Sequence, residues 1–126
     1  MVLIACVDDN FGLMFNKRRQ SKDRLVINRI VEIIKDNPIS MSDYSKELFD
    51  GESVILNEEN PKYYFLENEP LNDFSKVEKI ILFFWNRSYP SDVKFKLPEN
   101  FKEVSKSEFQ GNSHEKITEV HYEKTV

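Results

Sequence analysis

The sequence predicts an α/β fold with a mostly parallel central sheet, flanking helices and an antiparallel pair of strands near the C-terminal end. Residues 2–7 are a continuous apolar run, residues 26–34 repeat apolar side chains at helical spacing, and two long strand patterns follow from residue 79 onward. The chain has 126 residues, of which 40% are apolar. This length suffices for one core and is too short for two ordinary domains, so residues 1–126 are expected to form a single domain.

The composition limits which binding partners and which cellular compartment are expected for this protein. A formal net charge of −4 gives the chain no overall basic surface, so no nucleic-acid partner is expected. The single cysteine, Cys6, excludes an internal disulfide and a multi-cysteine zinc site, and suits a reducing compartment. No apolar stretch is long enough to span a membrane, and Met1–Val7 lack the basic leader and cleavage site of an export signal, so we expect a cytoplasmic protein. The sequence does not decide the oligomeric state, and a homo-oligomer is one of the alternatives.

The first elements are a strand and a helix. The run Val2–Val7, bounded by Asp8-Asp9-Asn10, is typical of a strand covered on both faces, and we expect it in the sheet interior with Cys6 buried. The next apolar positions predict a helix that Ser21 caps and that ends near Asp36-Asn37-Pro38. These positions lie on one helical face: Val26, Ile30, Ile33 and Ile34.

The remaining elements follow in order. Residues 39–41 return the chain to the sheet, and Ser42 is expected to cap a second helix that runs to Phe49 and stops at Asp50-Gly51. Two further strands are predicted at 53–56 and 63–66, with a polar turn at 57–61 between them. Residues 79–85 are apolar on both faces, and residues 117–123 alternate, which is typical of an antiparallel edge on a parallel sheet.

Two stretches of this sequence resemble dihydrofolate reductases. "VLIACVDDNFGLMFNKRRQSKDRLVINRI" resembles their first strand, loop and helix, including a V-D-x-N-x-x-G-like segment, and "VEKIILFFWNRSYPSDVKFKLPENFKEVSKSEFQ" with "NSHEKITEVHYEK" is similar to their last three strands. The resemblance covers roughly four fifths of the chain and implies a reduced dihydrofolate-reductase-like fold. It also implies that Asp23 stands where those enzymes place a substrate-binding acid.

The chain departs from that family where the family binds its nicotinamide cofactor. Those reductases use a Gly-Gly step after a central strand and a Gly-basic pair at the second helix, because backbone amides and a cation must approach phosphates. Here the three glycines are isolated, and Met41-Ser42-Asp43 replaces the second pattern. The segment between Leu66 and Val77 is also short, which we interpret as loss of a central strand. No NADPH and no other cofactor is therefore expected, and reductase activity is not expected.

Two candidate ligand contacts lie in the first loop. Asp23 could pair with a protonated heterocycle through its two oxygens, or could serve only the dipole of the helix that it precedes. Arg18 and Arg19 have the side chain suited to bidentate binding of an anion, although basic loops are commonly only solvated. If these residues form a pocket wall, the arginines should be held by Asp23, by Glu115 or by a bound anion.

The segment Gly111–Ile117 supplies the other candidates, His114 and Glu115. Ser113, His114 and Glu115 are consecutive, and on an extended chain His114 points away from its two neighbours. The motif is therefore not a ready-made triad, and partners of His114 have to come from other segments. His121 belongs to a regular strand alternation. Because the two histidines lack the spacing of known zinc motifs, no metal site is expected. Trp85 is interpreted as edge packing.

These observations favour a cofactor-free module that binds a small anionic or heterocyclic ligand, or a protein partner, where the loop 15–23 meets the sheet. One alternative is a hydrolase or transferase for a phosphorylated or nucleotide-like metabolite that uses Arg18, Arg19 and His114. Another is self-association through exposed aromatic side chains. The candidate ligand-binding residues are Arg18, Arg19, Asp23, His114 and Glu115.

Overall fold

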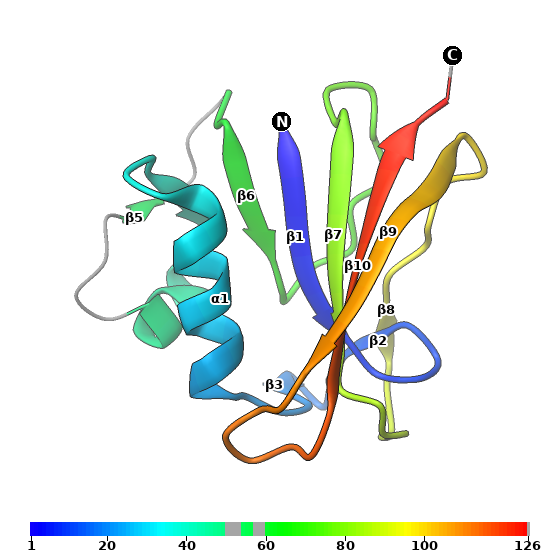
Figure 1. Ribbon diagram of the computed structural model, residues 1–126. Coiled ribbons are helices and arrows are strands. Elements are labelled where there is room, and N and C mark those ends of the chain that lie inside the picture. Colours follow the sequence, from blue (N-terminus) through cyan, green and yellow to red (C-terminus); the bar gives the residue numbers. More distant parts are fainter. Residues whose placement is uncertain (50–53, 57–59, 126) are drawn as a thin grey trace.

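The computed structural model describes residues 1–49, 54–56 and 60–125. These residues form a seven-stranded sheet of order β5-β4-β6-β1-β7-β10-β9 and a small sheet of order β3-β2-β8 (Figure 1). The predicted α/β architecture, with a mostly parallel sheet and an antiparallel C-terminal pair, is confirmed. The strands of the large sheet are β1 Val2–Val7, β4 Ile39–Met41, β5 Val54–Leu56, β6 Tyr63–Leu66, β7 Lys79–Phe84, β9 Phe101–Phe109 and β10 Ile117–Lys124.

Strand β1 lies in the sheet interior, as its apolar run predicted. It pairs in parallel with β6 on one side and with β7 on the other. Its side chains alternate between two cores, because successive residues of a strand face opposite sides of a sheet. Leu3, Ala5 and Val7 belong to the core opposite the helix, whereas Ile4 packs with the helix and Cys6 lies at the border of that core.

Helix α1, Arg24–Ile34, covers one face of the sheet (Figure 1). Val26, Ile30 and Ile34 are buried in the same core as Ile4, as predicted, whereas Ile33 is only partly buried against it. The predicted cap is wrong: Asp23, in extended conformation, is the N-cap, and its carboxylate accepts the N–H of Leu25. The Ser21 hydroxyl instead contacts His114.

The second helix spans the predicted residues but has 3₁₀ geometry. Asp43–Phe49 form the 3₁₀ helix η1, which buries Ser45 and Phe49. The predicted stop at Asp50-Gly51, Ser53 and most of the predicted turn at 57–61 lie outside the described residues. No helix in the described part of the chain is long and apolar enough to cross a membrane.

The short connection after Leu66 leaves no gap in the large sheet. Strand β1 is hydrogen-bonded to both β6 and β7, so the sheet is continuous through its centre. Residues 67–78 contain neither helix nor strand, and they return along the sheet face opposite α1, where Leu71 and Phe74 pack against the core. This segment therefore links the two strands that flank β1 without a helix or strand of its own.

The C-terminal strands form an antiparallel edge. Strand β10 pairs with β7 and with β9, and a register shift separates His121 from Tyr122. Glu119 of β10 is buried on the helix side, where Arg29 donates to it at 2.7 and 3.0 Å and His121 lies 2.6 Å away. This polar cluster ties the middle of α1 to the sheet.

The small sheet was not predicted. Strands β2, Gly12–Phe15, and β3, Arg18–Arg19, form a hairpin whose turn residues Asn16 and Lys17 both have positive φ. That pair of left-handed residues is the geometry of a type I′ turn. Strand β8, Val93–Lys94, pairs with the other edge of β2. The hairpin places Arg19, Gln20 and Ser21 beside the carboxyl end of β1.

Candidate functional site

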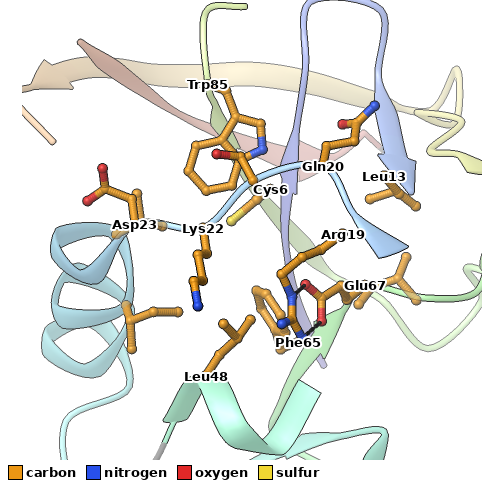
Figure 2. Close-up of a pocket in the computed structure, with 14 residues that line it drawn as sticks. Cys6, Leu13, Arg19, Gln20, Lys22, Asp23, Leu48, Phe65, Glu67 and Trp85 are labelled. Atoms are coloured by element: carbon orange, nitrogen blue, oxygen red, sulfur yellow. Dashed lines mark hydrogen bonds and ion pairs between the residues drawn. The ribbon is translucent and has the colours of Figure 1, made fainter. Parts of the chain in front are cut away.

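A narrow cavity lies at the carboxyl ends of β1 and β6, beside the start of α1 (Figure 2). Ligands of α/β proteins commonly bind at this edge, where successive connections leave a central strand in opposite directions. The free volume is about 20 Å³, close to the space that one water molecule needs. The apolar walls include Leu13, Val26, Phe65 and Trp85, and the polar walls include Arg19, Ser21, Lys22, Asp23 and Glu67.

Arg19 forms the most extensive ion-pair network of this cavity. Its guanidinium donates to both carboxylate oxygens of Glu67, at 2.8 and 3.2 Å, and to Glu47 at 2.8 Å. It also lies over the ring of Tyr44, 4.5 Å from the centroid. Burial disfavours the charged guanidinium, but the hydrogen bonds to Glu67 and Glu47 outweigh that effect and raise the pKa of Arg19. Arg19 is thus neutralised within the chain.

Glu67 follows β6 directly and is buried. Ser45 of η1 donates to Glu67 Oε1 at 2.7 Å, so the acid is held by the 3₁₀ helix as well as by Arg19. A buried carboxylate requires such partners, because its desolvation is costly. The network therefore fixes the hairpin, η1 and the end of β6 relative to one another.

Asp23 is buried at the start of α1 and its oxygens are occupied by the chain itself. Oδ1 accepts the N–H groups of Leu25 and Asn112, both at 2.9 Å. Oδ2 accepts the N–H of Ser113 at 2.9 Å and lies 2.9 Å from Nδ1 of His114. Burial opposes ionisation, but these hydrogen bonds outweigh it and hold the pKa of Asp23 well below its ordinary value. Asp23 is an ionised carboxylate with its acceptor positions filled.

His114 connects Asp23 to Ser21. Its Nδ1 faces the Asp23 carboxylate and its Nε2 lies 2.9 Å from the Ser21 hydroxyl. The imidazole is 3% exposed and stacks on the Trp85 indole, with ring centroids 4.6 Å apart and planes 25° apart. The interpretation of Trp85 as edge packing is wrong, because this side chain is buried between the sheet and His114.

Gly111 allows the loop before β10 to approach α1 closely. A Cβ atom at this position would lie 2.6 Å from Asp23 Oδ2 and 3.0 Å from the His114 carbonyl oxygen. The Gly111 N–H donates to that same carbonyl oxygen at 3.0 Å. Any larger residue would push the loop away from the helix N-terminus, so the glycine is required by packing.

A wider groove adjoins the narrow cavity. Its volume is about 590 Å³, within the usual range of small-ligand sites, and it shares Lys22, Asp23, Ile27 and Leu48 with the narrow cavity. Lys22 and Arg24 are exposed there, and among the described residues neither forms an ion pair. The groove thus combines two cations that form no ion pair with apolar side chains, and its two acids, Asp23 and Glu47, are paired with His114 and Arg19. Its apolar lining includes Ile27, Val31, Leu48 and Phe49.

The structure separates the five predicted site residues. Arg19 and Asp23 line the narrow cavity, and His114 lies directly behind Asp23. Arg18 and Glu115 are exposed, and neither side chain makes a hydrogen bond or ion pair within the described part of the chain. The expectation that Asp23 or Glu115 holds the arginines is wrong, because Arg19 binds Glu67 and Glu47.

Sequence reasoning missed Ser21 as a partner of His114 and missed Glu67 entirely. Glu67 directly follows an apolar strand, and this position at the carboxyl end of a parallel strand was the available signal. Ser21 was assigned to a cap that Asp23 occupies. Across 1–49, 54–56 and 60–125, no group of three or more His, Cys, Asp or Glu side chains could hold a metal ion.

Comparison with known proteins supports the fold. No protein-family model matches the sequence, and no curated protein matches it significantly. Among solved structures, the chain is similar to dihydrofolate reductase from Enterococcus faecalis complexed with NADP(H) and RAB-propyl, with a TM-score of 0.65 and 9% sequence identity. The match covers 100% of this chain and 97% of that chain. The chain therefore has a dihydrofolate-reductase-like fold in a short, divergent form.

Proposed function

We propose that the chain is a cofactor-free module that binds a small anionic ligand with an apolar body in the groove beside α1. The observation that carries this proposal is the pairing of uncommitted cations, Lys22 and Arg24, with apolar side chains of the same groove. Binding energy for such a ligand would come from burial of its apolar part, and the cations would select its charge.

The residues do not fit the ligands that the fold family implies. A protonated heterocycle needs two free acceptors on Asp23, and the chain already fills them. Glu67 and Glu69 follow β6, and exposed Asp43 begins η1, so acids stand near the positions where that family binds phosphate groups.

The alternatives receive less support. Arg19 is neutralised and Arg18 is exposed, which weakens a phosphate-processing enzyme built on that pair. The exposed large apolar side chains Phe15, Leu25, Tyr44 and Val104 come from four different elements, which does not favour self-association over ligand binding.

The test uses phenyl phosphate, which combines a dianion with an apolar ring, in titrations followed by two-dimensional NMR and calorimetry. We expect saturable shifts at the start of α1, weaker binding of phenol and of inorganic phosphate, and weaker phenyl phosphate binding after Lys22→Ala or Arg24→Ala. Lys46→Ala, an exposed lysine of η1 outside the groove, is the matched control. Absence of saturation, or equal binding by all three variants, would contradict the proposal.

A further inference from the structure

We propose that Ser21, His114 and Asp23 form a nucleophile–base–acid triad that hydrolyses small acyl esters. The three groups lie in series: Ser21 Oγ is 2.9 Å from His114 Nε2, and His114 Nδ1 is 2.9 Å from Asp23 Oδ2. This is the order and spacing of groups in serine hydrolases, which is recognised by geometry and not by sequence position. The residues come from two segments more than 90 positions apart.

The hydrogen bonds assign the protons. Asp23 is ionised and can only accept, so the His114 nitrogen that faces it, Nδ1, carries a proton. In the neutral imidazole, Nε2 then has a free lone pair, which faces the Ser21 hydroxyl. This tautomer is the one that can take the proton of Ser21, so the resting arrangement is ready for general-base catalysis.

Each group is held in place by the surrounding chain. Three backbone N–H groups, of Leu25, Asn112 and Ser113, orient the Asp23 carboxylate. The stacked Trp85 indole fixes the plane of the His114 ring. Ser21 and His114 are the catalytic residues of this proposal, and Asp23 is a positioning residue.

Ser21 is accessible from the narrow cavity. It is half-buried and lines the narrow cavity together with Cys6, the other potential nucleophile there. Burial, followed by the charges of Glu67 and Asp23, raises the pKa of Cys6, so its thiol stays protonated and unreactive. The N–H of Lys22 follows the nucleophile, the position that supplies an oxyanion donor in α/β-hydrolases, and none of the described hydrogen bonds uses it.

The reaction balances without a redox partner. Ser21 Oγ attacks the ester carbonyl carbon as its proton moves to His114 Nε2. The carbon–oxygen bond to the alcohol then breaks, the alcohol oxygen takes the proton from Nε2, and an acyl-Ser21 ester remains. A water molecule attacks that ester, gives a proton to Nε2, and releases a carboxylic acid as the proton returns to Ser21.

The cavity sets the class of substrate. Its free volume of about 20 Å³ is close to that of one water molecule, so at most a methyl group of the acyl part could enter it. The alcohol part would extend into the adjoining groove beside Lys22 and Arg24, an assignment that rests on the ligand site proposed above. We therefore infer short-chain esters of anionic alcohols as the preferred class.

Two assays test the triad directly: hydrolysis of 4-nitrophenyl acetate, and covalent labelling by a fluorophosphonate with the adduct located by mass spectrometry. We expect one adduct, on Ser21. Ser21→Ala should abolish it and reduce hydrolysis on the order of 10²-fold or more, whereas Ser105→Ala, an exposed serine of β9, should change neither. Asp23→Asn should lower kcat while KM stays near the wild-type value, which a purely structural loss would not produce.

Ser21→Ala is the decisive variant because it should still fold: Ser21 is half-buried, and its removal leaves no buried charge unpaired. Hydrolysis by Ser21→Ala equal to that of the wild type, or labelling at any other residue, would overturn the triad. Phenyl phosphate binding and ester hydrolysis by the wild type separate the two proposals. A wild type that binds phenyl phosphate but does not hydrolyse 4-nitrophenyl acetate refutes the triad alone, and a wild type that hydrolyses the ester but does not bind phenyl phosphate refutes the ligand site alone.

Discussion

The Trp85 indole lies nearly parallel to the His114 imidazole, and the two ring centroids are 4.6 Å apart. Trp85 directly follows β7, and His114 lies in the loop between β9 and β10. The contact therefore joins the centre of the sheet to the loop that reaches α1. Because the chain contains one tryptophan, selectively excited tryptophan fluorescence reports on the surroundings of Trp85.

Trp85→Ala should destabilise the protein by about 3–5 kcal/mol, the usual cost of removing a large buried aromatic side chain. Trp85→Phe should cost less, since a smaller ring still covers the imidazole. Urea denaturation followed by circular dichroism measures both. An alanine variant as stable as the wild type would show that the indole is not packed as described.

The two neighbouring arginines should differ sharply. Arg18→Ala should change the free energy of unfolding by less than about 0.5 kcal/mol, as is usual for an exposed residue without partners. Arg19→Ala should cost about 3 kcal/mol, because it leaves Glu67 buried with an uncompensated charge.

The double variant Arg19→Met with Glu67→Gln provides the control for the arginine pair. It should recover part of the loss, since no buried charge is then left unpaired. Equal effects of Arg18→Ala and Arg19→Ala in chemical denaturation would contradict the network.

Asp23 should make stability depend on pH in the acid range. Because its pKa is lower in the folded protein than in the unfolded chain, its contribution is complete above about pH 4, the ordinary aspartate range, and is lost as the pH falls further. Asp23→Asn should remove part of this dependence and, at neutral pH, cost about 1–3 kcal/mol, because an amide nitrogen would face a backbone N–H.

Asp36→Asn, an exposed acid just after α1, is the matched control for Asp23→Asn and should retain the wild-type pH profile. Denaturation curves collected between pH 2 and 7 give the comparison. If the free energy of unfolding falls equally with acid pH in Asp23→Asn and the wild type, folding does not stabilise the ionised Asp23 carboxylate.

Reduced nicotinamide cofactor should give no saturable signal in fluorescence or calorimetric titration. Phosphate groups need hydrogen-bond donors and cations. Acids stand instead at the expected positions: Asp43 at the start of η1, and Glu67 and Glu69 after β6. Micromolar binding would contradict this prediction and would restore a reductase interpretation.

The large elements were predictable because each is fixed by local pattern. Strand β1 is apolar throughout and α1 repeats buried residues at helical spacing, so burial and periodicity point to the same structure. The small sheet was missed because β2, β3 and β8 are two to four residues long. Its type I′ turn uses Asn16-Lys17, which lacks the glycine that usually marks such turns.

The candidate site was only partly predictable because its contacts cross the chain. Asp23 was identified as important, but its partners depend on where β10 pairs with β9, which brings Ser113 and His114 over the start of α1. Spacing within Gly111–Ile117 gave no sign of this, since His114 contacts Ser21 and Asp23 of a distant segment in addition to its neighbour Ser113. Register across strands, and not local periodicity, sets this part of the molecule.

The sequence separation of His114 from Ser21 has a consequence for how the protein is made. During synthesis residues 1–34 leave the ribosome before residue 111, so Asn112, Ser113 and His114 are not yet available as partners of Asp23. The acid and the serine become a connected unit only when β10 inserts between β7 and β9. Any chemistry at Ser21 is thereby withheld from the nascent chain and begins only once its last strand has docked.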